Sequence, residues 1–178
     1  FPEVFDDLRP APDTGPPPSE IPVDQQIVTH VTASTVRVDA DGCRRGYVGS
    51  GWVADDGLVV TNAHVVAGSS TQTVRRADGT VLDAQVVRYD PVSDLAVLQV
   101  GGLDRPPLPI GSVEPDSEGA AIGYPGGQDE PRVAAAGIRS QRTTIGRDIY
   151  GDAGAEREVV YLASTLRKGD SGGPVIDS

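Results

Sequence analysis

The sequence predicts an all-β protein of two small barrels, with a short helix and a proline-rich segment before the first barrel. Segments rich in Val, Thr, Ile and Tyr recur at short intervals, and this composition favours β-strands. The Asp-Gly pairs at 41–42, 56–57 and 78–79 are typical of tight turns between neighbouring strands. Prolines at 106, 107 and 109 interrupt the pattern and divide the strand segments into two sets.

Residues 1–24 are predicted to form a linker ahead of the folded body. They contain seven of the fifteen prolines, with Asp, Glu and Ser between them and few apolar side chains. Asp24 suits the N-cap of a helix, and Ile27 and Val31 follow at helical spacing. We therefore expect one short helix to lead into the first barrel. His30 lies in this helix or at its end, where we interpret it as a surface or structural residue.

Two sets of strand segments follow the helix. The first set lies in residues 25–105, and its six segments are enough to close a small barrel. The second set lies in residues 106–178 and has four segments, so we expect a second barrel that is unfinished. Because the chain begins at Phe1 and contains no methionine, we expect it to be cut from a longer precursor. The approximate strands are 34–40, 46–54, 58–61, 71–77, 80–89 and 95–100, then 118–123, 131–146, 157–164 and 174–177.

Composition excludes several classes of function. The 178 residues suffice for one ordinary domain or two small barrels, and their net charge of −11 disfavours nucleic-acid partners. No apolar run approaches the roughly 20 residues that cross a bilayer. Two histidines and a single cysteine, Cys43, are too few for a histidine- or cysteine-based metal site, and no phosphate-binding motif occurs. We therefore expect no metal and no organic cofactor.

A serine flanked by glycines is the first candidate for chemistry. Residues 169–174 read Gly-Asp-Ser-Gly-Gly-Pro, so the backbone around Ser171 can bend tightly and leave the hydroxyl uncovered. A serine is a weak nucleophile that needs a base, and the base needs an acidic partner to hold its tautomer. His64 follows an apolar strand segment, and Asp94 opens the last strand of the first set. The order His, Asp, Ser therefore predicts a catalytic triad.

Four motifs in this order resemble the chymotrypsin-fold serine proteases, in the bacterial trypsin-like group that includes the HtrA/Deg proteases. They lie at residues 49–53, 61–66, 93–98 and 169–174. Residues 148–152, Asp-Ile-Tyr-Gly-Asp, further resemble the MarP-like branch of membrane-anchored actinobacterial proteases. The resemblance implies two six-stranded β-barrels of the chymotrypsin type, of which the second would be truncated after the nucleophile, with an active site at the seam between them.

The resemblance also implies roles for individual residues. Ser171 would attack the scissile carbonyl and form an acyl-enzyme, His64 would transfer the proton, and Asp94 would orient the imidazole. The backbone N–H groups of Gly169 and Ser171 would form the oxyanion hole. The implied activity is that of a serine endopeptidase, a hydrolase that cleaves protein or peptide substrates without a metal or cofactor.

Three further residues lie near these motifs or in a predicted turn. Thr165 precedes Ser171 by six residues, where the resembling trypsins place an acidic residue that selects Lys or Arg. Threonine carries no charge, so we expect small or apolar side chains to be preferred. Asp170 is expected to bond to local backbone or to an arginine. Cys43 is either a small buried apolar group or the partner of a cysteine outside this sequence.

Two alternatives to a protease arise from the same residues. Residues 169–173 also fit the Gly-x-Ser-x-Gly motif of α/β-hydrolases, but no histidine follows Ser171, which excludes that order. A non-catalytic module that binds a peptide or partner on the same fold stays open. We expect residues 1–178 alone to be weak or inactive, with a missing C-terminal segment or another chain completing the barrel. The resemblance implies a periplasmic or cell-envelope location, tethered to the membrane.

Overall fold

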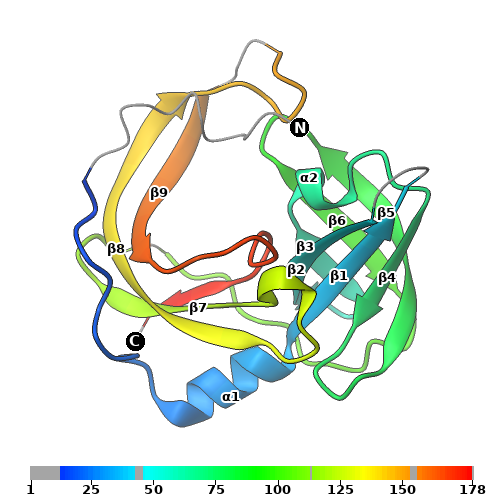
Figure 1. Cartoon of the computed structure of the whole chain (residues 1–178), viewed down its shortest axis with the longest axis horizontal. Coiled ribbons are helices and arrows are strands. Elements are labelled where there is room, and N and C mark those ends of the chain that lie inside the picture. Colours follow the sequence, from blue (N-terminus) through cyan, green and yellow to red (C-terminus); the bar gives the residue numbers. More distant parts are fainter. Residues whose placement is uncertain (1–12, 43–45, 113, 153–155, 178) are drawn as a thin grey trace.

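A closed β-barrel lies beside a second, open sheet in the computed structural model, which describes residues 13–42, 46–112, 114–152 and 156–177. Residues 165–174, which precede the last strand of the second sheet, lie between the barrel and that sheet (Figure 1). This architecture confirms the predicted all-β fold class. Cys43 lies outside the described residues, just after the predicted turn at 41–42.

The first six strands close into an antiparallel barrel, as the sequence predicts. Around the barrel the strands follow the order β1-β2-β3-β6-β5-β4, and β1 pairs with both β2 and β4. Gly57 and Gly79 occupy two of the predicted turns with φ of +65° and +85°, which glycine adopts without strain. The strands are β1 (Thr35–Asp41), β2 (Gly46–Asp55), β3 (Leu58–Thr61), β4 (Thr71–Arg75), β5 (Val81–Asp90) and β6 (Leu95–Val100).

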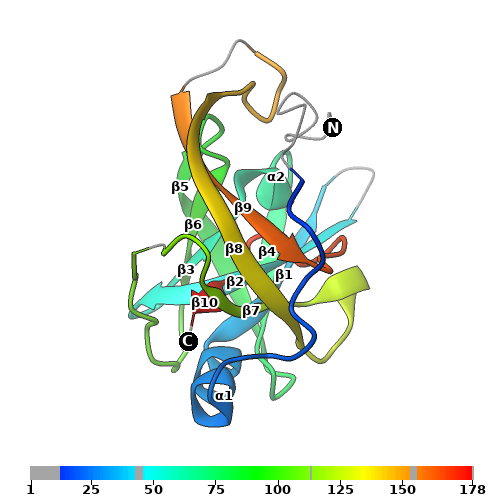
Figure 2. The same ribbon diagram turned by 90° about the vertical axis from the view of Figure 1, so that its left-hand side faces the viewer.

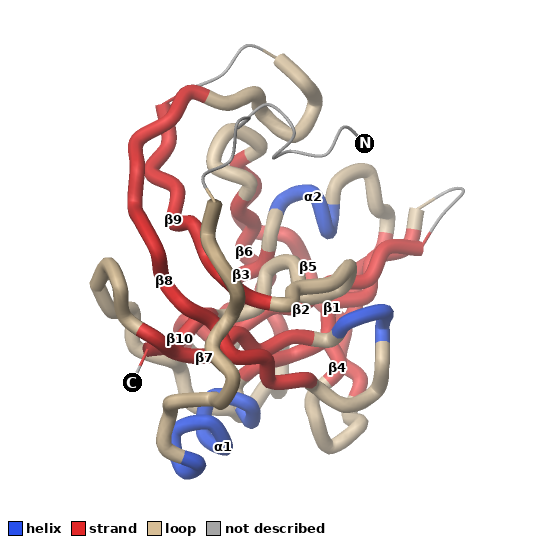
Figure 3. The backbone as a smooth tube through the Cα atoms, turned by 60° about the vertical axis from the view of Figure 1, so that its left-hand side comes forward, coloured by secondary structure: helices blue, strands red, loops and turns tan. Residues whose placement is uncertain are grey.

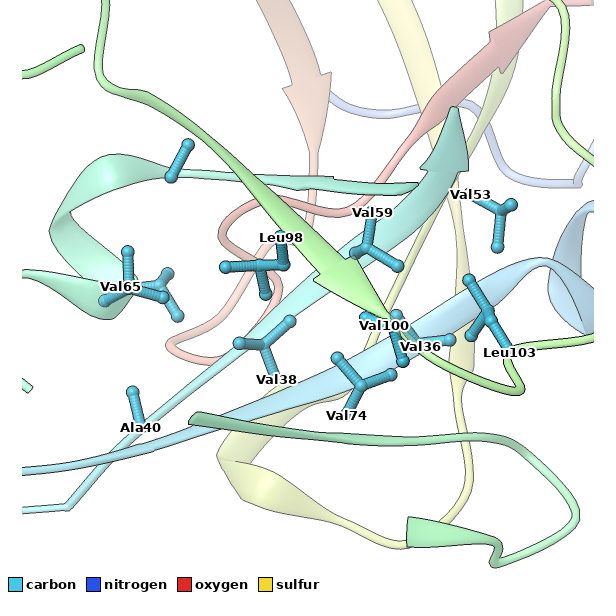
Figure 4. Packing of buried hydrophobic residues seen from close by; sticks show 12 residues of the cluster. Val36, Val38, Ala40, Val53, Val59, Val65, Val74, Leu98, Val100 and Leu103 are labelled. Atoms are coloured by element: carbon cyan, nitrogen blue, oxygen red, sulfur yellow. The ribbon is translucent and has the colours of Figure 1, made fainter. Parts of the chain in front are cut away.

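Apolar side chains on alternate residues fill the interior of the barrel. Val36 and Val38 of β1 are fully buried, because residues two apart on a strand face the same side. Val38, Val59 and Leu98 meet in this interior from β1, β3 and β6 (Figure 4). Burial of each such side chain contributes about 1.5–3 kcal/mol relative to exposure to water. The interior therefore makes the barrel a firm support for the loops at its rim.

The second sheet is antiparallel and has the strand order β10-β7-β8-β9. Its strands match the four predicted segments to within one residue at each end. The short 3-10 turn η1 (Pro125–Gly127), which connects β7 to β8, was not indicated by the sequence. The strands are β7 (Glu118–Gly123), β8 (Arg132–Ile145), β9 (Glu156–Ser164) and β10 (Val175–Asp177).

Two short helices, α1 (Gln25–Ala33) and α2 (Ala63–Val66), lie well apart, with α1 at the bottom of the view and α2 in its upper half (Figure 3). The Asp24 carboxylate accepts a hydrogen bond from the Gln26 N–H at 2.7 Å, which confirms Asp24 as the N-cap of α1. His30 is exposed in the last turn of α1, as expected for a surface residue. Within the described ranges, none of the helices combines the length and apolarity needed to span a membrane.

Helix α1 packs against the second sheet rather than standing apart from it (Figure 2). Val28 packs against Ala120 of β7, and Val31 packs against Ile122 of the same strand. Val23, which the sequence places in the linker, is also buried in the cluster with Ala120. The end of the proline-rich segment is thus part of the packed structure. The domain boundaries at residues 24 and 105 stay a prediction.

Replacement of Leu98 by alanine should destabilise the barrel, because the truncated side chain leaves a cavity in a closed interior. We expect the free energy of unfolding to fall by about 2–5 kcal/mol, measured by urea denaturation. Leu95→Ala is the matched control, because Leu95 lies in the same strand with 47% of its surface exposed. For Leu95→Ala the free energy of unfolding should fall by less than about 1 kcal/mol. An equal decrease in the free energy of unfolding for the two variants would contradict the view that the buried interior stabilises the barrel.

Candidate active site

The histidine and the aspartate predicted for the triad are in direct contact. Nδ1 of His64 lies 2.7 Å from Oδ2 of Asp94, and the backbone N–H of His64 donates to Oδ1 at 2.9 Å. A carboxylate only accepts hydrogen bonds, so the proton of the neutral ring belongs on Nδ1 and the lone pair on Nε2. The His64 side chain is 28% exposed and the Asp94 side chain 4%. The pair therefore presents a ring nitrogen that can accept a proton.

Asp94, at the turn between β5 and β6, is held by hydrogen bonds from the two residues at the start of α2. Its carbonyl oxygen accepts from the Ala63 N–H at 3.1 Å and from the side-chain amide of Asn62 at 2.8 Å. Its φ is +54°, a left-handed conformation that aspartate tolerates better than most side chains. The buried carboxylate is compensated by its own two contacts with His64, which hold it beside α2.

The loop between β9 and β10 passes so close to other backbone segments that side chains do not fit at two of its glycines. Gly172 has a φ of +87°, and a Cβ there would lie 2.2 Å from the carbonyl oxygen of Ser50. Gly169 has a φ of +101°, and its Cβ would lie 2.4 Å from the carbonyl oxygen of Tyr124. Only glycine satisfies both the conformation and the contact, which explains the glycines around Ser171.

Ser171 is attached to the barrel through its backbone. Its carbonyl oxygen accepts from the N–H of Ser50 in β2 at 2.8 Å, and the residue is half-buried. Among the described residues, no hydrogen bond joins the Ser171 hydroxyl to His64. Such contacts are often long in substrate-free sites and tighten when substrate binds. The structure thus joins His64 to Asp94 directly and ties Ser171 to the same barrel through β2.

Two backbone N–H groups at Ser171 donate to no acceptor within the part of the chain that the structure describes. They belong to Gly169 and to Ser171 itself. The carbonyl oxygen of Lys168 accepts from the Gly126 N–H at 2.7 Å. Because a trans peptide directs its N–H opposite to its carbonyl, the Gly169 N–H points away from Gly126. Free donors of this kind suit a negatively charged oxygen.

Thr165 and Asp170 have partners of different kinds. Arg132 of β8 donates to the Thr165 hydroxyl at 2.7 Å and to its carbonyl oxygen at 3.0 Å. The sequence did not indicate this positive charge beside Thr165. The Asp170 carboxylate accepts from the backbone N–H of Arg167 at 2.8 Å, which confirms the expected local bond.

The loop between β8 and β9 covers the helix that carries His64. Ile149 of this loop is fully buried and packs against Ala63 and Ala67. The hydroxyl of Tyr150 lies 2.6 Å from the hydroxyl of Tyr89 on β5. Burial raises the pKa of Tyr89 most, and the hydrogen bond with Tyr150 raises it further, so the Tyr89 hydroxyl stays neutral at physiological pH. The loop between β8 and β9 therefore contacts α2 through an apolar side chain and β5 through an uncharged polar pair.

Three residues that shape this site lie inside motifs noted in the sequence, but the sequence assigned them no role: Ser50, Asn62 and Ile149. The available signal for Ser50 was a serine between two glycines inside an apolar strand. For Ile149 it was a single apolar side chain in a polar loop. Neither pattern names a partner, and the Ser50 hydroxyl bonds to Gly169, which is 119 positions away.

The assembled groups suit nucleophilic acyl transfer. They comprise a hydroxyl on a tight loop, an imidazole oriented by a carboxylate, and backbone donors beside the hydroxyl. Over the described ranges, no group of three or more His, Cys, Asp or Glu side chains could hold a metal ion.

Comparisons of the sequence identify relatives with serine protease names. The model of the trypsin-like peptidase domain matches residues 49–178. Serine protease Rv3671c of Mycobacterium tuberculosis is 40% identical over 161 residues, which are 87% of this chain and 40% of that protein. A probable periplasmic DegP-like serine endoprotease of Brucella suis is 38% identical over 135 residues, 72% of this chain and 25% of that protein. The chain thus spans less than half the length of these relatives.

Solved structures share the architecture described above. The active form of the Rv3671c protease from M. tuberculosis superimposes with a TM-score of 0.78 and 36% identity, over 96% of this chain and 78% of that chain. The HtrA-type protease AlgW with tripeptide gives a TM-score of 0.72 and 26% identity, over 84% of this chain and 49% of that chain. Because the family model matches most of the chain, including both His64 and the Ser171 loop, the chain belongs to the trypsin-like peptidase family.

Proposed function

We propose that this chain carries the catalytic residues of a serine endopeptidase, which cleaves peptide bonds through an acyl-enzyme. The observation behind the proposal is the His64–Asp94 pair, bonded at 2.7 Å, on the barrel against which the loop of Ser171 is held. Membership of the trypsin-like peptidase family and the serine protease names of its relatives support it.

In the proposed reaction, Ser171 Oγ attacks the carbonyl carbon of the scissile peptide while its proton passes to Nε2 of His64. Asp94 holds the ring in the required tautomer and stabilises the imidazolium that forms. The N–H groups of Gly169 and Ser171 bind the oxyanion. His64 then gives the proton to the leaving amine as the C–N bond breaks, and water hydrolyses the acyl-enzyme by the same steps.

The location and assembly of the whole protein are part of the proposal, since the chain covers 40% of its M. tuberculosis relative. An extracytoplasmic location is supported by the DegP-like relative, which is named periplasmic. We propose a membrane anchor beyond the proline-rich linker, as in the actinobacterial branch. The match covers 78% of the Rv3671c chain, and we propose that further strands complete the second barrel of this protein. Turnover by residues 1–178 alone should accordingly be weak.

An active-site-directed fluorophosphonate should label Ser171 in the full-length protein, because an activated serine attacks the phosphorus. Mass spectrometry of the labelled peptide locates the adduct. Ser171→Ala should lose both the label and the cleavage of casein, whereas the matched control Ser19→Ala, at an exposed serine, should keep both. Peptide binding without any labelling of Ser171 would favour the non-catalytic binding module instead.

Asp94→Asn should lower kcat by about ten-thousandfold, because the amide favours the wrong tautomer of His64. The melting temperature reports whether the fold is retained, and kcat is measured with a chromogenic peptide. Asp83→Asn, at an exposed aspartate of β5, is the control and should leave kcat unchanged. A decrease in kcat of less than about tenfold would show that Asp94 is not the carboxylate of a catalytic triad.

Peptides with a small or apolar residue before the scissile bond should be cleaved faster than those with Lys or Arg. Thr165 carries no negative charge, and the Arg132 guanidinium bonded to it repels a second cation. Rates over a peptide library that varies this one position measure the preference. Arg132→Gln should raise the relative rate for basic residues. Faster cleavage after Lys or Arg by the unmodified protein would refute the assignment of Thr165 to the specificity pocket.

A further inference from the structure

Ser50 is a fully buried polar residue of β2 with no role in the steps proposed above. Its hydroxyl donates to the carbonyl oxygen of Gly169 at 2.7 Å and accepts from the N–H of Tyr124 at 2.8 Å. Tyr124 directly follows β7, and Gly169 belongs to the loop that carries Ser171. One hydroxyl therefore joins the barrel, the end of a strand in the second sheet and the nucleophile loop.

The backbone of Ser50 holds the same loop at a second point. Its N–H donates to the carbonyl oxygen of Ser171 at 2.8 Å. The side chain and the backbone of one residue thus bind two carbonyl groups, on either side of Asp170. Because both donors belong to one strand of a closed barrel, they restrict the position and the rotation of the peptide groups between Gly169 and Ser171.

This restriction matters because the backbone of Gly169 can rotate more freely than that of other residues. Its φ of +101° is open to glycine, and no Cβ limits alternative orientations. The Lys168 carbonyl is held by the Gly126 N–H at 2.7 Å, and the Gly169 carbonyl is held by Ser50. With these carbonyls occupied, the N–H groups of Gly169 and Ser171 are left without acceptors in the described part of the chain.

We propose that Ser50 is a positioning residue whose buried hydroxyl holds residues 169–171 in the orientation in which their N–H groups bind the oxyanion. The proposal rests on the serine endopeptidase function proposed above. Since β2 belongs to the barrel that carries His64 and Asp94, the same hydroxyl also sets the nucleophile loop against the base. Ser50 touches no reacting atom and acts through the peptide groups that it orients.

A purely structural role for the hydroxyl predicts a different outcome, and Ser34 provides the matched case. Ser34 is also fully buried, and its hydroxyl donates to the carbonyl oxygen of Pro106 at 2.8 Å. Removal of either hydroxyl leaves a carbonyl group without its donor, so both serine-to-alanine changes should lower stability. Of these two serines, only Ser50 donates to the loop that holds Gly169 and Ser171.

The test compares Ser50→Ala with Ser34→Ala in the full-length protein. A chromogenic peptide gives kcat and KM, and a peptide aldehyde reports on the oxyanion site because its adduct places an oxygen there. For Ser50→Ala we expect kcat to fall about 100-fold with KM within about threefold, as for the loss of an interaction made only in the transition state. The inhibition constant of the aldehyde should rise by a similar factor.

The control should separate stability from chemistry. Ser34→Ala should lower the melting temperature as Ser50→Ala does, while kcat and the inhibition constant change by less than about threefold. Ser50→Cys, which keeps a weak donor of similar size, should recover part of the lost kcat. If Ser50→Ala does not fold at the assay temperature, Ser50→Cys takes its place, and its kcat must lie below that of Ser34→Ala.

Equal kcat values for the folded Ser50 and Ser34 variants, or a Ser50→Ala defect confined to KM, would overturn the positioning role. An active wild-type protein with an unaffected Ser50→Ala variant overturns this inference alone. A wild-type protein that neither cleaves peptides nor takes up the fluorophosphonate overturns the proposed function and this inference with it.

Discussion

The close approach of two backbones, β2 of the barrel and the loop before β10, is the constraint on which the candidate site depends. A hydrogen bond of 2.8 Å joins Ser50 to Ser171, and the carbonyl of Ser50 leaves no room for a Cβ at Gly172. Backbone hydrogen bonds have a narrow range of lengths, so this contact determines where Ser171 lies relative to the barrel. The close packing of the two backbones therefore requires glycine in the 169–174 motif, independently of any catalytic role.

Asp94 illustrates how the barrel supports a residue that would be unfavourable elsewhere. A buried carboxylate costs free energy unless it is hydrogen-bonded, and both of its oxygens contact His64. Its left-handed backbone is held by Asn62 and Ala63, which bond to its carbonyl oxygen. Asp94 orients the imidazole of His64, and the β5–β6 turn that carries Asp94 is limited in its movement by the neighbouring strands of the closed barrel.

The candidate groups come from two sheets, so contacts between the sheets bear on activity as well as on stability. Arg37 of β1 donates to the carbonyl oxygen of Gly127 in η1 at 2.8 Å, close to the segment that holds Lys168. Its ion pair with Asp129 contributes little, because the Asp129 side chain is 80% exposed. Ile149 closes the opposite side by packing against α2. Within the described residues, short polar contacts and buried apolar side chains, Ile149 among them, join the barrel and the second sheet around the site.

The strand segments, the six-stranded barrel and the residues of the His64–Asp94 pair could be predicted from the sequence, because alternation, turn residues and motifs are local patterns. The sequence by itself determined which strands form and which side chains are chemically suited to the site. Only the tertiary structure decided that Ser50 meets Gly169, that Ile149 covers α2 and that Arg132 meets Thr165. These partners are distant along the chain, and packing of the two sheets selects them, since hydrogen bonds and apolar contacts depend on proximity in space.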